Sequence, residues 1–185
     1  MNAATDGPAV VIGMGNLLLH DDGIGVRVVE ALRSVAEHDP TALPQATRLV
    51  DGGTLGLDLL STFEGARSLL LLDAVDLDQP AGTVSVLRGG DDILAAGGTW
   101  GGCIPGGVSE LLSVARLMGW LPEPVALVGI QVSDTTYGEG LSACVAAALP
   151  RAVETARDEL RELDQLAETA LPRTAGTVEA EGATA

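Results

Sequence analysis

Short apolar runs, separated by stretches of helical periodicity or by turn residues, constrain the fold of this chain more than any other feature. Five such runs occur, at residues 8–13, 46–50, 68–72, 83–87 and 125–130. Each has the length of a strand, and the run 68–72 (Ser-Leu-Leu-Leu-Leu) is apolar on both faces, which predicts a central strand. The pattern therefore predicts strands that alternate with helices.

The expected helices follow apolar residues at helical spacing. They are predicted at residues 23–37, 54–60, 108–118 and 141–166. Thr54 could cap the second helix with its hydroxyl group, and Pro150 is expected to kink the last one. Residues 89–107 are rich in glycine, and we expect a long loop there, of a kind that often carries function.

This alternation is typical of the α/β class. We predict one domain at residues 1–167, a three-layer αβα sandwich around a twisted, mostly parallel sheet of about five strands. The run 83–87 follows the third run after a connection too short for a parallel crossover, so we expect it to lie antiparallel to the third strand. Residues 168–185 are expected to form a disordered acidic tail.

Composition excludes several classes of function. The formal net charge is −16, and a strongly acidic surface repels phosphate backbones, so we expect no nucleic-acid partner. All ten basic residues are Arg, which excludes a P-loop and Schiff-base chemistry, since both need Lys. The two cysteines are not a disulfide framework, and no run is long enough to span a membrane. We therefore expect a soluble cytoplasmic monomer without a membrane partner.

Two carboxylates, those of Asp22 and Asp73, are predicted to meet at one edge of the sheet. In a doubly wound sheet, ligands bind beyond the carboxyl ends of the strands, where the strand order reverses. The loops after the first and third strands carry Asp21, Asp22 and Asp73. Converging carboxylates need a shared proton or a cation, and a divalent metal is the simpler solution. Alternatively, Asp22 could only cap the helix, and Asp73 could only bond a turn.

Two glycine motifs adjoin this edge. In Asp51-Gly52-Gly53-Thr54 the glycines permit close approach by another backbone, such as an incoming peptide, although a tight turn also explains them. The stretch 13–16 (Gly-Met-Gly-Asn) suggests a dinucleotide-binding loop, but Leu18 stands where that fingerprint needs its third glycine. An oxidoreductase is therefore disfavoured.

The histidines and cysteines leave alternatives open. His20 lies two residues before Asp22 and could reach the same crevice or lie on the surface. Cys103, in the glycine-rich segment, could be a soft metal ligand or an inert small residue. Cys144 falls on the apolar side of the last predicted helix, so we expect it in the core.

Several motifs together resemble those of the hydrogenase maturation proteases. Residues 13–26 (Gly-Met-Gly-Asn-Leu-Leu-Leu-His-Asp-Asp-Gly-Ile-Gly-Val) resemble the opening signature of that family. Similar motifs follow in the family's order at residues 51–54, 72–74, 80–83, 111–116 and 127–130. The resemblance covers about residues 9–160. It implies an aspartyl-type endopeptidase that removes a C-terminal peptide from the hydrogenase large-subunit precursor, once that precursor carries nickel.

The resemblance also implies a site. In this family an acidic residue, an aspartate and a histidine ligate the metal, which the precursor carries and the protease does not hold permanently. The first two correspond to Asp22 and Asp73, which would also be catalytic. Ile104 stands near the place of the histidine, so Cys103 or His20 could substitute as a ligand. The implied substrate-binding residues are Asn16, Asp51, Gly52, Gly53 and Thr54. The missing histidine leaves a second interpretation open, a nickel-sensing or precursor-binding scaffold without turnover.

Overall fold

The computed structural model describes residues 7–96 and 107–169, which form a five-stranded sheet in the order β2-β1-β3-β5-β4. The strands are β1 (Ala9–Met14), β2 (Thr47–Gly53), β3 (Ser68–Val75), β4 (Val84–Arg88) and β5 (Val125–Gln131). The first three and β5 are parallel, and β4 is antiparallel to β5. The predicted α/β class and the mostly parallel sheet with one antiparallel strand are confirmed.

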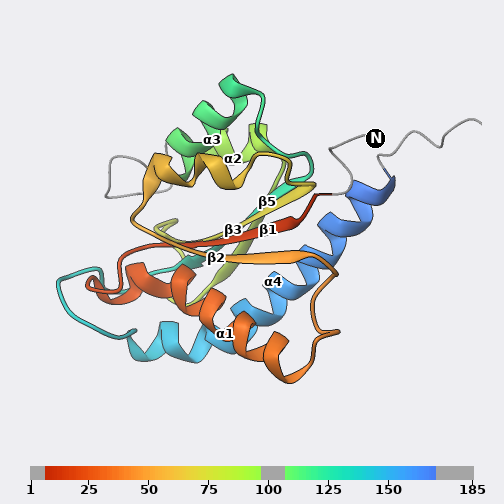
Figure 1. Cartoon of the computed structure of the whole chain (residues 1–185). Helices are drawn as coiled ribbons and strands as arrows, with labels where there is room; N and C mark the ends of the chain where they lie inside the picture. Colours follow the sequence, from red (N-terminus) through yellow and green to blue (C-terminus); the bar gives the residue numbers. More distant parts are fainter. Residues whose placement is uncertain (1–6, 97–106, 170–185) are drawn as a thin grey trace, which may run out of the picture.

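Helices cover both faces of the sheet (Figure 1). They are η1 (His20–Gly23), α1 (Ile24–His38), η2 (Gly56–Thr62), α2 (Gly90–Ala96), α3 (Val108–Met118) and α4 (Ala143–Thr169), where η denotes a 3-10 helix. The pair α1 and α4 packs on one face, while η2, α2 and α3 pack on the other. This arrangement is the predicted three-layer sandwich.

Neighbouring residues of a strand pack into two different hydrophobic cores, because successive side chains point to opposite faces of a sheet. Val11 and Leu70 belong to the core beneath α1 and α4. Ile12 and Leu71 belong to the core beneath η2, α2 and α3, which also contains Phe63. All five side chains are buried, and fully burying one such side chain contributes about 2 kcal/mol.

Arg67, just before β3, fastens the amino edge of the sheet. Its Nε donates to Asp164 Oδ1 on α4 at 2.7 Å, and its Nη1 donates to the carbonyl oxygen of Gly7 at 2.7 Å. A third donor, Nη2, reaches the carbonyl oxygen of Gln45 at 2.7 Å. The start of β1 and the last turns of α4 therefore meet at one side chain.

The fourth strand runs antiparallel to the third, but the two are not neighbours in the sheet. The strand β4 is hydrogen-bonded to β5, which lies between β3 and β4. The direction is antiparallel to β3 as expected, because β3 and β5 are parallel. The short connection fixed the direction of β4, but β5, which follows much later in the chain, occupies the place beside β3.

Two predicted boundaries also differ. Residues 90–96 form α2 within the segment predicted as one long loop, and Asp91 and Asp92 in its first turn suit a helix N-terminus. Residues 97–106 of that segment lie outside the described residues. Thr54 caps no helix, because the following element is the 3-10 helix η2, whose N-cap is Leu55.

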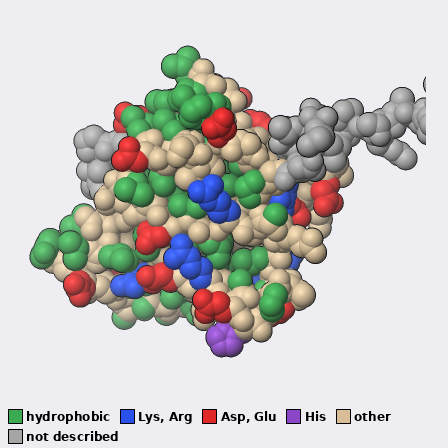
Figure 2. Space-filling model, viewed as in Figure 1, with side chains coloured by type: hydrophobic (Ala, Val, Ile, Leu, Met, Phe, Trp, Pro, Cys, Tyr) green, Lys and Arg blue, Asp and Glu red, His purple; other side chains and the backbone are tan. Residues whose placement is uncertain are grey.

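The long last helix is confirmed. It continues through Pro150 and ends at Thr169, so residues 168 and 169 are helical and the rest of the predicted acidic tail lies outside the described residues. No helix within the described part of the chain is long and apolar enough to cross a membrane. On the face shown in Figure 2, acidic side chains are scattered among arginine and hydrophobic ones.

Candidate active site

The loop after β1 folds tightly against the start of α1. Gly15 has a φ of 119°, and a Cβ there would collide with the carbonyl oxygen of Asp22. Its N–H donates to the carbonyl oxygen of Gly53 at 3.1 Å, which joins this loop to the end of β2. Glycine at position 15 is therefore required by both the backbone conformation and the close contact.

Asp22 is half-buried in η1 and is held from one side by this loop. The N–H of Asn16 donates to Asp22 Oδ2 at 2.7 Å. The side-chain oxygen of Asn16 accepts a hydrogen bond from the N–H of Leu18 at 3.0 Å, so its amide stabilises the loop itself. Both contacts are made within the protein, so the substrate-binding role expected of Asn16 stays a prediction.

Asp73 lies within β3, two residues before the end of the strand, and is half-buried. Burial raises the pKa of its carboxyl group to about 7, although the N–H of Ala74 donates to Oδ1 at 2.8 Å and opposes the rise. The negative charge of Asp22 raises this pKa further. A side chain with such a pKa can exchange a proton near neutral pH.

The two aspartates are close because the first turn of α1 lies against the ends of β1 and β3. A Cβ at Gly25 would collide with the carbonyl oxygens of Met14 and Leu72, so only glycine allows this approach. The helix η1 also contacts β3. Together with the effect of Asp22 on Asp73, these contacts show that the two predicted site residues converge where the strand order reverses.

This pair of carboxylates suits a cation or a shared proton, because two like charges at close range are unfavourable without one. Within residues 7–96 and 107–169, no group of three or more His, Cys, Asp or Glu side chains could hold a metal ion. Cys103 and Ile104, at the expected place of a third ligand, lie outside the described residues. The described part of the site therefore offers two carboxylates.

The motif at residues 51–54 ends β2 at the same edge of the sheet. Gly52 is buried, and a Cβ there would lie 2.7 Å from Ile12 Cγ2, so core packing requires this glycine. Gly53 has a φ of 42°. Asp51 and Thr54 are exposed beside the loop that carries Asp22, and their part in substrate binding stays a prediction.

His20 packs on the loop that follows β5. Its Nδ1 donates to the carbonyl oxygen of Gly140 at 3.0 Å, which assigns the proton to Nδ1. A Cβ at Gly138 would collide with the imidazole ring. The ring is thus engaged by this loop, and a role for His20 as a metal ligand stays a prediction.

The prediction that Cys144 lies in the core is wrong. The helix α4 begins at Ala143, and Cys144 is an exposed residue of its first turn, while Val145 and Ala148 pack inward. Its Sγ lies 3.3 Å from Ser142 Oγ.

Asp21 has a structural role that the sequence did not reveal. Its carboxylate is fully buried and accepts hydrogen bonds from the N–H groups of Ser133, Asp134 and Ser142 and from the Ser142 hydroxyl. Burial alone would raise the pKa of Asp21, but these hydrogen bonds outweigh it and hold the pKa below its usual range. A serine directly before a helix is a usual capping residue, and this was the signal available at position 142.

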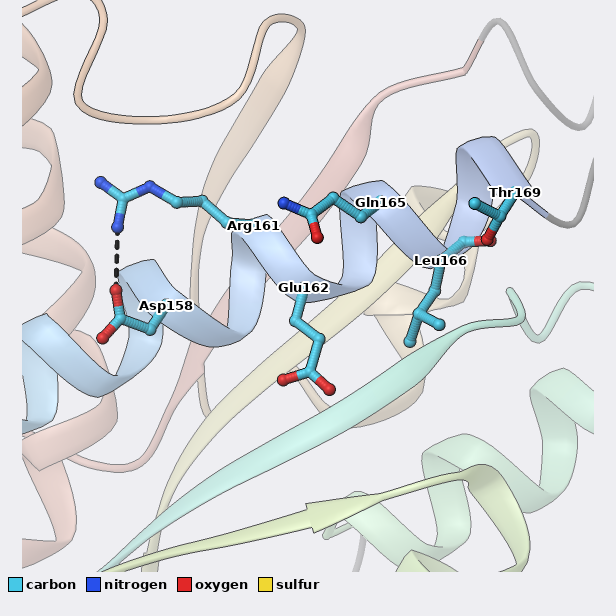
Figure 3. A pocket seen from close by; sticks show the side chains of 6 residues that line it. All are labelled: Asp158, Arg161, Glu162, Gln165, Leu166 and Thr169. Atoms are coloured by element: carbon cyan, nitrogen blue, oxygen red, sulfur yellow. Dashed lines mark hydrogen bonds and ion pairs between the residues drawn. The ribbon is translucent and has the colours of Figure 1, made fainter.

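A hollow on α4 lies apart from these residues. Its lining consists of Asp158, Arg161, Glu162, Gln165, Leu166 and Thr169, all from one helix (Figure 3). Arg161 Nη1 donates to Asp158 Oδ1 at 2.8 Å. The hollow contains none of the predicted site residues, so the carboxylate pair remains the candidate centre.

Known proteins are similar to this chain in sequence. Residues 26–159 match the family model of the hydrogenase maturation proteases. The hydrogenase expression/formation protein HupD of Rhodobacter capsulatus is 39% identical over 153 residues, which cover 82% of this chain and 70% of that protein. The hydrogenase 2 maturation protease of Escherichia coli is 33% identical over 83% of this chain and 90% of its own length.

A solved structure agrees with these sequences. The hydrogenase maturating endopeptidase HybD from E. coli superposes with a TM-score of 0.73 at 32% identity, covering 84% of this chain and 93% of that one. Sequence and fold thus point to the same relatives, and the match to the family model at residues 26–159 includes Asp73. The chain belongs to the hydrogenase maturation proteases, a family of peptidases, as its motifs predicted.

Proposed function

We propose that this peptidase removes a C-terminal peptide from the nickel-loaded precursor of a nickel–iron hydrogenase large subunit. The observation that carries the proposal is the convergence of Asp22 and Asp73 at one edge of the sheet, in a chain that belongs to a family of maturation proteases. The names of its relatives, a hydrogenase 2 maturation protease and a hydrogenase maturating endopeptidase, support a hydrogenase as the substrate.

The two carboxylates recognise the nickel that the precursor carries. A dication between Asp22 and Asp73 would relieve the repulsion that raises the pKa of Asp73. Cys103 supplies a further ligand, since a thiolate is a soft ligand for such a metal. The nickel belongs to the substrate, and the protease cleaves only a precursor that already carries it.

Asp73 acts as the general base in hydrolysis, in an aspartyl-type mechanism. A water molecule adds through its oxygen to the peptide carbonyl carbon while Asp73 accepts one of its protons. The carbon–nitrogen bond then breaks, and Asp73 returns the proton to the leaving amine.

The exposed edge beside the carboxylates seats the substrate segment. Asn16 and residues 51–54 line this edge, next to the loop that holds Asp22. We further propose that the protein acts as a cytoplasmic monomer, on the strength of its net charge of −16 and of two cysteines that form no disulfide framework.

The test is to incubate the protein with nickel-loaded and nickel-free precursor and to measure the mass of each precursor. We expect a C-terminal peptide to be lost from the nickel-loaded form alone, and the loss to disappear in Asp22→Asn and Asp73→Asn. Asp158→Asn, at an exposed carboxylate on α4, is the control that should cleave normally. An intact nickel-loaded precursor after incubation with the wild-type protein would overturn the proposal.

The scaffold interpretation is not favoured, because relatives that are about one third identical over most of the chain are named as proteases. It predicts that the wild-type protein binds the nickel-loaded precursor without changing its mass. The same incubation therefore separates the two functions.

A further inference from the structure

The segment before Asp22 is joined to the loop after β5 by a set of hydrogen bonds that we name the clasp, made of residues 18–21 and 133–142. The backbones pair at Gly138, whose N–H donates to the carbonyl oxygen of Leu18 at 2.9 Å, while its own carbonyl accepts from the N–H of His20 at 2.9 Å. The N–H of Asp21 donates to the carbonyl oxygen of Asp134 at 3.0 Å. The clasp therefore connects segments more than a hundred residues apart.

The carboxylate of Asp21 is the centre of the clasp. Its Oδ2 accepts from the N–H groups of Ser133 and Asp134, both at 2.9 Å, and from Ser142 Oγ at 2.8 Å. Its Oδ1 accepts from the N–H of Ser142 at 2.6 Å. Four charge-assisted hydrogen bonds to one fully buried carboxylate fix its position strongly.

The backbone next to Asp21 is held in an unfavourable conformation. His20 has a φ of 44°, a region that side chains other than glycine rarely adopt. Such a conformation persists only where the surrounding contacts over-determine it. Here the ring and the N–H of His20 are both hydrogen-bonded to the 138–140 segment, so the clasp maintains the strained turn.

The same turn orients Asp22. Adjacent residues of a 3-10 helix point about 120° apart, and while the Asp21 side chain enters the clasp, that of Asp22 meets the N–H of Asn16 at 2.7 Å. Behind it, the carbonyl of Asp22 lies against Gly15 with no room for a Cβ. A shift of Asp21 would therefore move the Asp22 carboxylate relative to Asp73.

We propose that Asp21, held by Ser142, is a positioning residue that fixes the Asp22 carboxylate opposite Asp73 for cleavage. This inference rests on the proposed function, in which Asp22 contacts the substrate's metal. Displacing a reacting group by about 1 Å costs on the order of 100-fold in rate. Weakening the clasp should therefore lower kcat, and it should also raise KM because Asp22 contacts the metal of the precursor.

The experiment compares Ser142→Ala, Ser142→Thr and Asp21→Asn with the wild-type protein, at a temperature well below the melting point of every variant. Ser142→Ala removes one hydrogen bond to Asp21 and keeps the backbone ones, so it should fold and lose about tenfold in kcat on nickel-loaded precursor. Ser142→Thr restores a hydroxyl group and should restore kcat. Asp21→Asn, which places an amide against several donors, should lose more.

Asp164→Asn is the matched control. It weakens the hydrogen bonds of a carboxylate to Arg67 at the amino edge of the sheet, so it should lower the melting temperature without lowering kcat. The carbon-13 signal of the Asp22 carboxyl group, identified by its absence in Asp22→Asn, should shift in Ser142→Ala and return in Ser142→Thr. A role in stability alone would move neither this signal nor kcat at low temperature.

The failures of the two proposals are distinguishable. If the wild-type protein leaves the nickel-loaded precursor intact, the proposed function fails. If the wild-type protein cleaves it, and folded Ser142→Ala cleaves equally fast with an unchanged Asp22 signal, the positioning role is overturned while the proposed function stands.

Discussion

Asp73 combines a half-buried position with a neighbouring carboxylate, and both raise its pKa. A carboxyl group in such a place destabilises the fold when it is ionised, because it loses water contacts that the unfolded chain would keep. Gly15 and Gly25 are also constrained by the site, because at each position a backbone carbonyl oxygen lies too close to leave room for a side chain. The two glycines thus allow the two aspartates to lie close together, and the ionised carboxylate of Asp73 lowers the stability of the fold.

Asp73→Asn should make the protein more stable at pH 8, by about 2 kcal/mol. The pKa of Asp73 is about 7 when folded and near 3.8 when unfolded, so between these values the folded state binds more protons. Stability from this group therefore falls as pH rises from about 4 to 7 and levels off above 7. Urea titrations at several pH values should show this slope in the wild-type protein and its absence in Asp73→Asn.

Asp58→Asn, at an exposed carboxylate in η2, is the control and should keep the wild-type slope. If Asp73→Asn were less stable than the wild-type protein at pH 8, burial of the ionised carboxylate would not be the source of the raised pKa.

Gly15→Ala should destabilise the protein by more than about 2 kcal/mol. The new Cβ would collide with the carbonyl oxygen of Asp22, and alanine would have to adopt an unfavourable positive φ. Gly65→Ala is the matched comparison. Gly65 also has a positive φ, of 71°, but no atom lies within 4 Å of the position that a Cβ would take there, so this change should cost only about 1 kcal/mol. Equal losses in urea unfolding would show that the contact with Asp22 is unimportant.

At the level of elements, side-chain bridges attach α4 to the sheet at several points. Near the end of β4, Arg88 forms two hydrogen bonds to Glu159, from Nε at 2.8 Å and from Nη2 at 2.6 Å. Glu159 is buried, while the Arg88 side chain is half exposed. At the other end of α4, the clasp holds Ser142 just before the first turn. The long helix is thus fixed to the sheet beyond its apolar face.

Glu159→Gln should lower the free energy of unfolding by about 1–2 kcal/mol, because a buried carboxylate loses its bidentate pairing. Glu162→Gln, which loses one exposed contact to the same Arg88 at 2.9 Å, should cost less than about 0.5 kcal/mol. Urea unfolding at low and high salt measures both. A loss for Glu162→Gln as large as that for Glu159→Gln would contradict the importance of burial.

The elements were predictable where the reason for them is local. The run 68–72 predicted β3 because its apolar side chains face both ways, but the strand extends to Val75, so Asp73 lies inside it. The place of β5 between β3 and β4 depends on contacts between residues that are far apart in the chain. A local sequence pattern carries no information about such contacts. For the same reason the buried role of Asp21 was missed, since its partners lie 112 to 121 residues away.

At the scale of the whole molecule, the sheet is buried on both faces. Leu70 and Leu71 are neighbours in β3, and each is fully buried in a different core. Such an arrangement gives the small domain two packed layers rather than one. It also explains how a chain with only 2% aromatic residues forms sufficient core from aliphatic side chains.

Leu70→Ala and Leu71→Ala should each lower the free energy of unfolding by about 2–5 kcal/mol, since each leaves a cavity in a separate core. Leu57→Ala, at a side chain that is 40% exposed, should cost much less. Chemical denaturation of the three variants provides the comparison. A small loss for either core variant would mean that one face of the sheet is less well packed than the structure indicates.

Arg67 brings Gly7 and the last turns of α4 to the amino edge of the sheet, whereas Asp22 and Asp73 converge where the strands finish. An affinity handle or a fluorescent fusion joined at either end of the described chain would therefore begin on the side remote from the carboxylates (Figure 1). A bulky substrate would then approach the edge that carries the two carboxylates of a surface-immobilised protease without meeting its support.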